Sequence, residues 1–492
     1  MSDTPGPSFR ALDPLASINR YFWILAVLSA IVLLAPIRVG DLAGYDDARY
    51  ALVAKHVVQS HHWLEIESNG GPALEHPPLF SWMQAVLFVP FGLSDPLAKL
   101  PSALCGLGVI LLVAWLGRRI TGDPFIGVLS MFVMATTIYF LKYAARAMTD
   151  VPFTFFFLAA VCAWLLGQED SRWVLVAGAF AALAQLTRAM AGFSIPLLFA
   201  IDVIVNRRRV PLRYLIGTAL IVLAPPAAWY AQWIYRYGAE FFVRDSTYLN
   251  QEVYGPLSPP WRRYTGAFEY LAMIAKSYWP WLPAMIAGMV VVIRRRDRKL
   301  RILILWIAVV YALCAITRSR VLRYMLPAYP AFSILSAIGL QWFFSERVVR
   351  NGLRILTPAL AIFVLVIAIH PPVNLHAVDT RPIALASTAA TAPNELITFY
   401  DDGAPRYDEM NEMLWYGNRY FVPVLESRSL PRALHMPKTR VFIMDANTFR
   451  TQVKSRIPNA IIARAGHLVC FRLLDTCAKP TACIGNNRRD DR

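Results

Sequence analysis

Long apolar runs, separated by short basic clusters, make up most of this chain. Each run has about 17 or more mostly apolar residues, close to the number that a helix needs to cross a bilayer. The runs lie near residues 21–37, 98–117, 124–141, 151–167, 173–187, 191–205, 213–235, 269–293, 302–317, 324–344 and 354–370. Of the 492 residues, 57% are hydrophobic and only 16% are charged. We therefore expect a polytopic α-helical membrane protein with about 11–13 transmembrane helices.

The basic clusters predict how the chain is oriented in the membrane. The formal net charge is +17, but the arginines stand in short groups and not along one continuous face, which disfavours nucleic acid as a partner. Residues 78–91 form a short apolar segment, and we expect an interfacial helix there, within a first outer loop at 38–97. Four arginine clusters then share the N-terminal side of the membrane, as the positive-inside rule requires. They are Arg118–Arg119, Arg207–Arg209, Arg294–Arg301 and Arg347–Arg354.

The sequence changes character after residue 371. The segments that read as strands are Ile397–Tyr400, Tyr420–Leu425, Arg440–Met444 and Ala460–Leu473, and those that read as short helices are Tyr407–Gly417 and Thr448–Ser455. Alternation of this kind predicts a small α/β domain. We therefore divide the chain into a transmembrane domain, residues 1–371, and an extracytoplasmic α/β domain, residues 372–492.

The predicted α/β domain contains three cysteines, Cys470, Cys477 and Cys483. An outer location would expose them to oxidising conditions, in which one disulfide can form. Three cysteines cannot all pair within one chain, and the sequence leaves the pairing open.

Two adjacent carboxylates, Asp46 and Asp47, follow the first apolar run. Carboxylates at the mouth of a membrane helix are costly to place and usually functional. In a group transfer at the membrane surface, such an acid could take the proton of the acceptor, and Asp46 is the first candidate. The alternative is structural, because Asp is a good helix N-cap and residues 48–58 have a helical pattern. Asp47 fits that second role.

Asp150 and several arginines form the second group of candidates. Asp150 stands at the outer end of the run 151–167, where it is either a functional acid or the start of a helix. The arginines predicted at or near the outer face, against the positive-inside bias, are Arg146, Arg188, Arg320 and Arg323. A lipid phosphate or pyrophosphate would suit them as a partner. The alternatives are snorkelling to the headgroups or pairing with the acids.

Glu75 and His76, with His61 and His62 upstream, carry groups that could hold a divalent metal ion. Their spacing is not diagnostic, and the histidines could instead anchor the loop in the membrane interface. Glu75 is the candidate metal ligand.

Five sequence blocks occur in an order that resembles a known family. They are GYDDARYALVAKHV, EHPPLFSW, ARAMTDVPFTFF, LTRAMAGFSIPLL and SRVLRYMLPAYP, and they fall within residues 20–345. Together they resemble the bacterial branch of the GT-C superfamily of membrane glycosyltransferases, the aminoarabinose-transferase and protein-mannosyltransferase-like enzymes. The resemblance implies a GT-C fold, with interfacial helices in the first outer loop and a small extracytoplasmic C-terminal domain.

The resemblance also implies a reaction. A sugar would pass, with inversion, from a polyprenyl-phosphate donor to an envelope acceptor, either lipid A or another glycolipid or glycan. The active site and the C-terminal domain would face the periplasm from the bacterial cytoplasmic (inner) membrane. The residues that the resemblance marks as catalytic are Asp46, Asp47 and Asp150. Those assigned to substrate or lipid-phosphate binding are Arg49, Tyr50, His76, Arg146, Arg188, Arg320, Arg323 and Tyr324.

The chain departs from the family's pattern at three of these positions. Asp47 replaces the usual Glu, His76 replaces a Lys, and Arg320 replaces a Lys with its charge kept. The His and Arg pair of the family has no clear counterpart in residues 237–268. This absence weakens the case for a divalent metal ion, the one cofactor considered, and the acceptor could differ from lipid A.

Two alternatives stay open at this point, beside a non-catalytic scaffold or assembly factor, which would not need the acid pair. The first is a protein O-mannosyltransferase-like enzyme that acts on Ser or Thr, because nothing in the chain identifies the acceptor or the sugar. The second is a polytopic transporter of lipid or sugar. A transporter usually places ionisable groups near the midpoints of its spans and shows repeated halves. Here the acids cluster at span ends and in one loop.

Overall fold

The computed structural model describes residues 14–42, 45–69, 71–73, 77–238, 240, 262–316, 321–370, 379–392, 394–400, 407–417, 419–424, 434 and 439–474. The chain divides into two compact units. The membrane unit comprises Met1–Val39, Glu75–Phe80 and Lys99–Pro372. The sheet unit comprises Gly40–Leu74, Ser81–Ala98 and Val373–Arg492, so it combines the first loop with the C-terminal segment. The predicted domain boundary between residues 371 and 372 stays a prediction.

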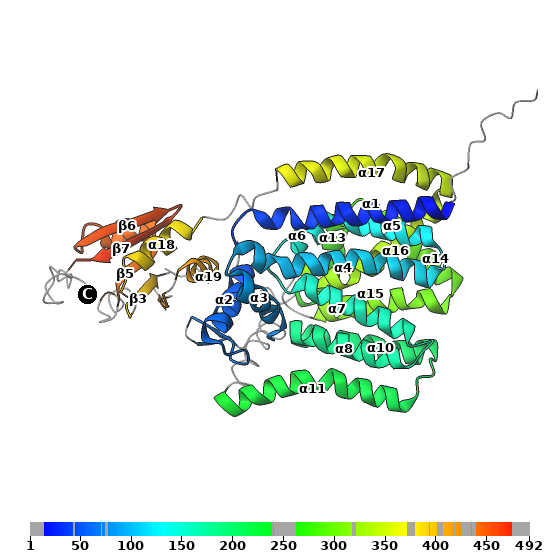
Figure 1. The fold of residues 1–492 in the computed structure, drawn as a ribbon, viewed down its shortest axis with the longest axis horizontal. Coiled ribbons are helices and arrows are strands. Elements are labelled where there is room, and N and C mark those ends of the chain that lie inside the picture. The colour runs from blue at the N-terminus through cyan, green and yellow to red at the C-terminus, as the bar shows by residue number, and fades with distance from the viewer. Residues whose placement is uncertain are drawn as a thin grey trace, which may run out of the picture. The chain divides into compact units, whose positions relative to one another are not determined.

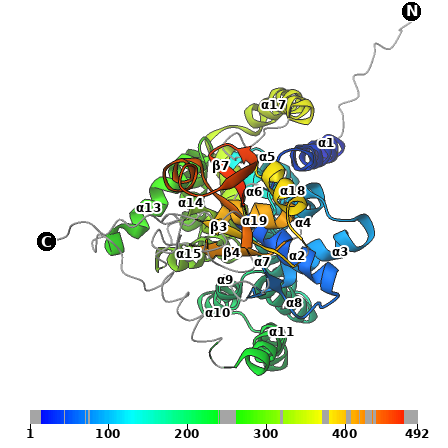
Figure 2. The same ribbon diagram turned by 90° about the vertical axis from the view of Figure 1, so that its left-hand side faces the viewer.

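Each predicted apolar run contains helix. A helix satisfies its own backbone polar groups, which a lipid environment requires of any segment that crosses it. The helices that lie wholly or mostly in the membrane unit are α1 (Pro14–Leu34), α4 (Asp95–Thr121), α5 (Pro124–Ala135), α6 (Ile138–Ala144), α7 (Asp150–Leu166), α8 (Arg172–Thr187), α9 (Ala189–Gly192), α10 (Ser194–Asn206), α11 (Leu212–Tyr237), α13 (Arg262–Ser277), α14 (Leu282–Arg295), α15 (Arg298–Ile316), α16 (Tyr329–Phe343) and α17 (Glu346–Ile369). The long ones run side by side, seen lengthwise in Figure 1 and end-on in Figure 2.

Five of the described helices are long and apolar enough to cross a bilayer, or up to six if α5 and α6 form one span bent by 68°. The chain is thus a multi-pass membrane protein, and the predicted helical fold class is confirmed. Shorter apolar helices of 10–17 residues, among them α7, α8 and α10, follow other predicted runs. The segment predicted to be interfacial forms α3 (Leu79–Phe91), whose 13 residues span roughly 20 Å. The number of crossings and the interfacial position of α3 stay predictions.

Several of the predicted runs are interrupted, contrary to a single continuous helix in each. The run 124–141 contains the break between α5 and α6, 191–205 contains the break between α9 and α10, and 269–293 contains the break between α13 and α14. The run 324–344 begins as a 3-10 segment, η2 (Leu322–Ala328), before α16 starts. Prolines account for the last two interruptions, because Pro280 and Pro327 each lack the backbone N–H that would continue an α-helix.

Helix α7 lies in the centre of the membrane unit. Fifteen of its residues, from Asp150 to Leu165 with one exception, are buried. A helix that is apolar on every side is typical of the interior of a protein rather than of its lipid-facing surface. Its first residue therefore lies in a desolvated environment.

The sheet unit contains a five-stranded sheet with the order β4-β3-β5-β7-β6. Strand β3 pairs in parallel with both β4 and β5, whereas β7 is antiparallel to β5 and β6. The strands are β3 (Leu396–Tyr400), β4 (Phe421–Val424), β5 (Thr439–Asp445), β6 (Asn459–Ala465) and β7 (Leu468–Leu473), with a two-stranded pair β1 (Glu67–Ser68) and β2 (Gly71–Pro72) in the first loop. The helices are α2 (Tyr45–Ser60), α3, α18 (Arg381–Ala389), α19 (Tyr407–Tyr416) and α21 (Ala446–Thr448), which a π-helical turn (Phe449–Val453) follows.

The α/β class predicted for residues 372–492 was correct, but one of the predicted strands was wrong. Residues 460–473 form a hairpin and not one strand, because the chain turns at Gly466 with φ of 52°. Glycine adopts this left-handed conformation without the steric cost that other residues have. Helix α18 had no counterpart in the prediction.

The described part of the sheet unit contains two apolar clusters, and one of them joins segments that are far apart in sequence. Leu52 of α2, Ile383 of α18 and Met413 of α19 pack with Phe399 and Ile443 of the sheet. The first loop and the C-terminal segment, more than 300 residues apart in sequence, therefore bury apolar surface against each other.

Candidate active site

Asp150 is the centre of a buried ionic cluster in the membrane unit. It is the first residue of α7 and is 1% exposed. Arg188, which follows the last residue of α8, donates from Nη1 to Oδ1 of Asp150 at 2.5 Å. Arg323, in η2, places its Nε 3.9 Å from the same oxygen. Three segments far apart in sequence thus bring two guanidinium groups to one carboxylate.

The backbone around each partner explains why they meet. An acidic residue in the first turn of a helix is favoured by the helix dipole, and Asp150 occupies that position in α7. The turn before it is fixed by Ser102 of α4, whose hydroxyl donates to the carbonyl of Met148 at 2.9 Å. Arg188 has extended backbone angles, φ −147° and ψ 93°, so the chain leaves the helical path of α8 at this residue.

Tyr324 lies against the same two arginines. The guanidinium carbon of Arg188 is 4.7 Å from the centroid of its ring, and that of Arg323 is 5.8 Å from it. Cation–π attraction at these distances adds to the ion pairs. The predicted site residues Asp150, Arg188, Arg323 and Tyr324 are therefore brought together.

Arg146 lies beside a different group of side chains. Its guanidinium carbon is 6.0 Å from the ring centroid of Tyr143. Tyr143 contacts Tyr139 at 5.0 Å, and Tyr139 stacks on Tyr329 at 6.0 Å, measured between ring centroids. These three tyrosines were not predicted as site residues. The signal that could have found them is their concentration beside the break that follows α5 and at the start of α16.

The acid pair belongs to the sheet unit and lies inside a helix, not before it. Helix α2 begins at Tyr45, earlier than the predicted residue 48, so Asp46 and Asp47 both lie in its first turn. The predicted role of Asp47 as an N-cap is therefore wrong, since the cap precedes the first helical residue. Neighbouring residues of a helix point about 100° apart. Accordingly Asp46 is partly exposed, whereas Asp47 is 2% exposed.

Arg49 and Tyr50, predicted to bind substrate, are 8% and 4% exposed. Among these four residues of α2, only Asp46 keeps a side chain that is more than slightly accessible. An acid that takes a proton from an acceptor must be reachable. The geometry of α2 thus favours Asp46 over its neighbour for that role.

Lys55 of α2 is a buried cation that the sequence did not single out. Its Nζ donates to the carbonyl oxygens of Leu414, Trp415 and Gly417 at 3.1, 3.0 and 2.7 Å. These carbonyls lie at the C-terminal end of α19, where the helix dipole favours a positive charge. Burial lowers the pKa of Lys55 to about 8. Its position indicates that it fixes α2, and with it Asp46, against α19.

Three predicted site residues, Glu75, His76 and Arg320, lie outside the described residues, as do Cys477 and Cys483. Within the described ranges, no group of three His, Cys, Asp or Glu side chains could hold a metal ion. The predicted metal ligand Glu75 thus stays a prediction. Cys470 is buried in β7 and carries a free thiol.

The sequence is similar to known proteins over most of its length. Residues 75–229 match the family model described as dolichyl-phosphate-mannose-protein mannosyltransferase. An undecaprenyl phosphate-alpha-4-amino-4-deoxy-L-arabinose arabinosyl transferase of Shewanella sediminis is 26% identical over 352 residues, 68% of this chain and 61% of that protein. An uncharacterized protein of Aquifex aeolicus is 24% identical over 59% of this chain and 58% of its own length. The matched part therefore spans about three fifths of these relatives.

The fold is shared with a solved structure. The crystal structure of ArnT from Cupriavidus metallidurans bound to undecaprenyl phosphate superimposes with a TM-score of 0.74 at 17% identity. The match covers 95% of this chain and 100% of that one. These comparisons confirm the predicted resemblance to the aminoarabinose-transferase and protein-mannosyltransferase-like branch of the GT-C glycosyltransferases.

Proposed function

We propose that this chain is a glycosyltransferase that moves a sugar from a polyprenyl-phosphate donor to an acceptor of the cell envelope. The observation that carries the proposal is the meeting of Arg188 and Arg323 at Asp150, in a fold shared with a protein solved with bound undecaprenyl phosphate. Guanidinium groups form paired, charge-assisted hydrogen bonds to phosphate, which makes arginine the preferred phosphate ligand in a desolvated site.

In the proposed reaction, Arg188 and Arg323 bind the phosphate of the donor. Asp150 and Tyr324 hold both guanidinium groups in place, so that little reorganisation is needed when charge develops. As the bond between the anomeric carbon and the phosphate oxygen breaks, negative charge grows on the departing polyprenyl phosphate. The arginines stabilise that charge.

Asp46 is the proposed general base. The hydroxyl of the acceptor attacks the anomeric carbon from the face opposite the phosphate, which inverts the configuration. Its proton passes to the carboxylate of Asp46, which is partly exposed at the first turn of α2. One bond to oxygen forms and one breaks, and the products are the glycosylated acceptor and the free polyprenyl phosphate.

The acceptor class is proposed by analogy with the relatives. The name of the Shewanella sediminis relative, an arabinosyl transferase that uses an undecaprenyl-phosphate sugar, favours a glycolipid such as lipid A or an envelope glycan. The match of residues 75–229 to a protein mannosyltransferase model supports Ser or Thr of a protein as the second candidate. Catalysis on the periplasmic face of the inner membrane is part of the same proposal.

Mass spectrometry of lipid A, surface glycans and envelope proteins tests the proposal. Cells would carry the wild-type chain, a deletion, Asp46→Asn, or Asp170→Asn as a control at an exposed acid that follows α7. We expect a sugar-sized mass on one acceptor class to be absent from the deletion and from Asp46→Asn, and present in the control.

The other outcomes separate the parts of the proposal. If the sugar is missing from the deletion but present with Asp46→Asn, the chain is required for the transfer and Asp46 is not its base. A deletion that changes no glycosylated acceptor would overturn the transferase assignment and favour a transporter or an assembly factor.

A further inference from the structure

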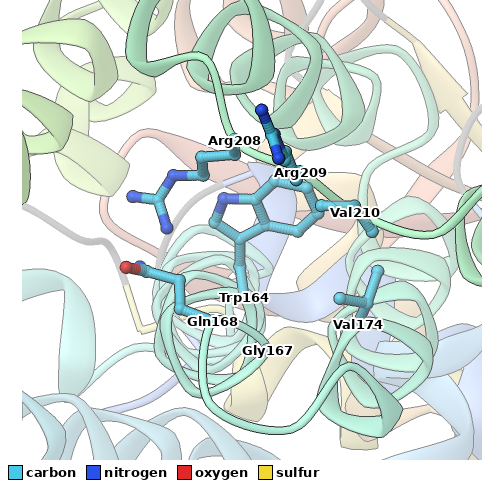
Figure 3. A pocket seen from close by; sticks show the side chains of 7 residues that line it. All are labelled: Trp164, Gly167, Gln168, Val174, Arg208, Arg209 and Val210. Carbon is cyan, nitrogen blue, oxygen red and sulfur yellow. The ribbon is translucent and has the colours of Figure 1, made fainter.

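A polar cavity lies at the end of α7 opposite Asp150. It has a volume of about 150 Å³ and is lined by Trp164, Gln168, Arg208 and Arg209 together with three smaller residues. Figure 3 shows the guanidinium group of Arg208 and the amide of Gln168 on one side of the Trp164 indole, with Val174 and Val210 on the other. Trp164 is 14 positions after Asp150 in α7, roughly 21 Å along the helix. The cavity is thus separate from the proposed active site.

The guanidinium group of Arg208 is held in place by a buried carboxylate. Asp202 of α10 is fully buried, and its Oδ2 forms an ion pair with Nε of Arg208. The same carboxylate accepts hydrogen bonds from Nε1 of Trp164 at 2.7 Å and Nδ2 of Asn206 at 2.6 Å. Nη1 of Arg208 is also buried and has no hydrogen-bond acceptor in the described part of the chain. A buried donor without an acceptor indicates a missing anionic or polar partner.

Further positive charge surrounds this cavity. Arg209 lines it, is exposed, and forms no ion pair with a described carboxylate. Arg301 of α15 donates to Oδ1 of Asn206 at 3.2 Å, which brings the basic start of α15 to the same end of the unit. The mouth of the cavity is therefore cationic.

An apolar cavity adjoins the polar one. It has a volume of about 550 Å³ and shares Trp164, which stacks on Phe199 with ring centroids 4.4 Å apart. Its walls come chiefly from α10 and α11, and apart from the Trp164 indole the polar side chain in its lining is that of Thr218. That hydroxyl donates to the carbonyl of Val174 at 2.9 Å, so it is already satisfied.

The apolar cavity has the length and the accessibility that a lipid chain needs. It extends along α10 from Phe193 to Ile204, roughly 16 Å along the helix. Phe193 is 47% exposed and Leu223, on the opposite wall, is 50% exposed, so the cavity opens at the surface of the membrane unit.

We propose that these two cavities, which share the side chain of Trp164, bind one anionic phospholipid. Its phosphate would pair with the guanidinium groups of Arg208 and Arg209, which line the polar cavity, and one acyl chain would lie in the apolar cavity between α10 and α11. Charge complementarity supports this occupant over a neutral lipid, because basic pockets between membrane helices are typical sites for anionic headgroups. The proposal does not depend on the transferase activity.

Lipid binding to the purified full-length chain tests the proposal, with native mass spectrometry as the readout. The probes are phosphatidylglycerol and phosphatidylcholine with identical acyl chains. Arg209→Gln removes one headgroup contact, and Arg207→Gln is its control, because Arg207 carries the same charge two residues away and does not line the cavity. Ala219→Trp fills the apolar cavity, and Ala224→Trp is its control at an exposed position of α11 outside the lining.

We expect one phosphatidylglycerol to bind in preference to phosphatidylcholine. Arg209→Gln should weaken that binding about fivefold, the usual contribution of one arginine near an anionic lipid. Ala219→Trp should abolish it, and both controls should bind as the wild type does. Equal binding of the two lipids, or equal effects of Arg209→Gln and Arg207→Gln, would overturn the proposal. Displacement of the lipid by millimolar inorganic phosphate would instead assign the site to a soluble anion.

Discussion

Asp150 shows how a buried charge can organise a site from distant segments. Replacing it by asparagine removes the carboxylate that Arg188 and Arg323 share while nearly preserving its shape. Removal of one member of a buried ion pair typically costs about 3–5 kcal/mol, because the remaining charge stays desolvated. We therefore expect Asp150→Asn to lower the thermal-unfolding midpoint of the purified chain and to weaken binding of the polyprenyl phosphate.

A double-mutant cycle separates the ion pair from general damage. If Asp150 and Arg188 act together, Asp150→Asn combined with Arg188→Gln should be less destabilised than the sum of the single variants. Asp170→Asn, at an exposed acid, should change stability by less than about 0.5 kcal/mol. Strict additivity in the cycle would show that the ion pair does not couple the two residues.

Lys55 gives the sheet unit a predictable pH dependence. Burial lowers the pKa of Lys55 from 10.5 to about 8 in the folded chain. Between these two pH values the unfolded chain binds more protons than the folded one, so the free energy of unfolding rises as the pH rises. The shift corresponds to a gain of about 3 kcal/mol in the free energy of unfolding. None of this gain is present below pH 8, and all of it is present above pH 10.5.

The measurement is the difference in thermal-unfolding midpoint between the wild type and Lys55→Met from pH 7 to pH 11. Methionine does not titrate and leaves three carbonyls without their donor, so the variant should be less stable throughout. The difference in midpoint between the wild type and Lys55→Met should grow as the pH rises from about 8 to 10.5. A gap that stays constant or narrows would contradict the lowered pKa.

The sequence could predict the members of the Asp150 cluster but not their contacts. Arg188 and Arg323 stood out because arginines on the predicted outer face violate the positive-inside bias and need an anionic partner. Asp150 and Arg188 are 38 positions apart, and no spacing rule joins them. Lys55 was missed because a lysine within a helical pattern normally faces solvent. Its acceptors lie 359–362 positions further along the chain.

Among the elements, α14 and α16 pack so closely that two glycines are required between them. A Cβ added at Gly288 would lie 1.9 Å from the carbonyl oxygen of Leu335, and one added at Gly339 would lie 1.9 Å from that of Ala284. Small residues that let helix backbones approach are a common basis of helix association in membranes.

We expect Gly288→Ala to lower the thermal-unfolding midpoint and Gly352→Ala to raise it slightly. The second glycine lies in α17 with no atom within 4 Å of an added Cβ. Alanine there should stabilise the helix by about 0.5–1 kcal/mol, because it has the higher helix propensity. At Gly288, the cost of the clash with the Leu335 carbonyl would be larger than this gain in helix propensity. Similar effects of the two substitutions would disprove the close approach of α14 and α16.

At the scale of elements, the sequence did not predict where helices are interrupted or where a strand turns back. Apolar length located the five described helices that are long enough to cross a bilayer, because burial in lipid depends on composition. It did not reveal that a run such as 269–293 is divided, since a proline can end a helix, kink it or begin a new one. The hairpin at Gly466 was missed for a related reason. Its two strands, β6 and β7, form one continuous β-favouring run with a single glycine as the turn signal.

For the whole molecule, the sheet unit links the acid pair to the C-terminal segment. Lys55 is bonded to α19, and the side chain of Asn69 exchanges two hydrogen bonds of 2.9 Å with the backbone of Phe421. Arg381 of α18 pairs with Asp41 at 2.6 Å and with Asp95 at 2.9 Å. The helix that carries Asp46 therefore depends on residues that follow the last membrane helix.

A chain truncated after residue 372 tests this dependence by hydrogen exchange. It should still insert, because the described membrane helices precede the cut. Peptides from α2 should exchange at least about a hundredfold faster, since Lys55 loses three hydrogen bonds of a charged donor, each contributing roughly 1.5–3 kcal/mol. Peptides from α7 serve as the control and should be unchanged. Because Asp46 lies on α2, the truncated chain should also lose the proposed sugar transfer. Unchanged protection of α2 would show that the first loop folds without the C-terminal segment, and the link between that segment and catalysis would then have to be abandoned.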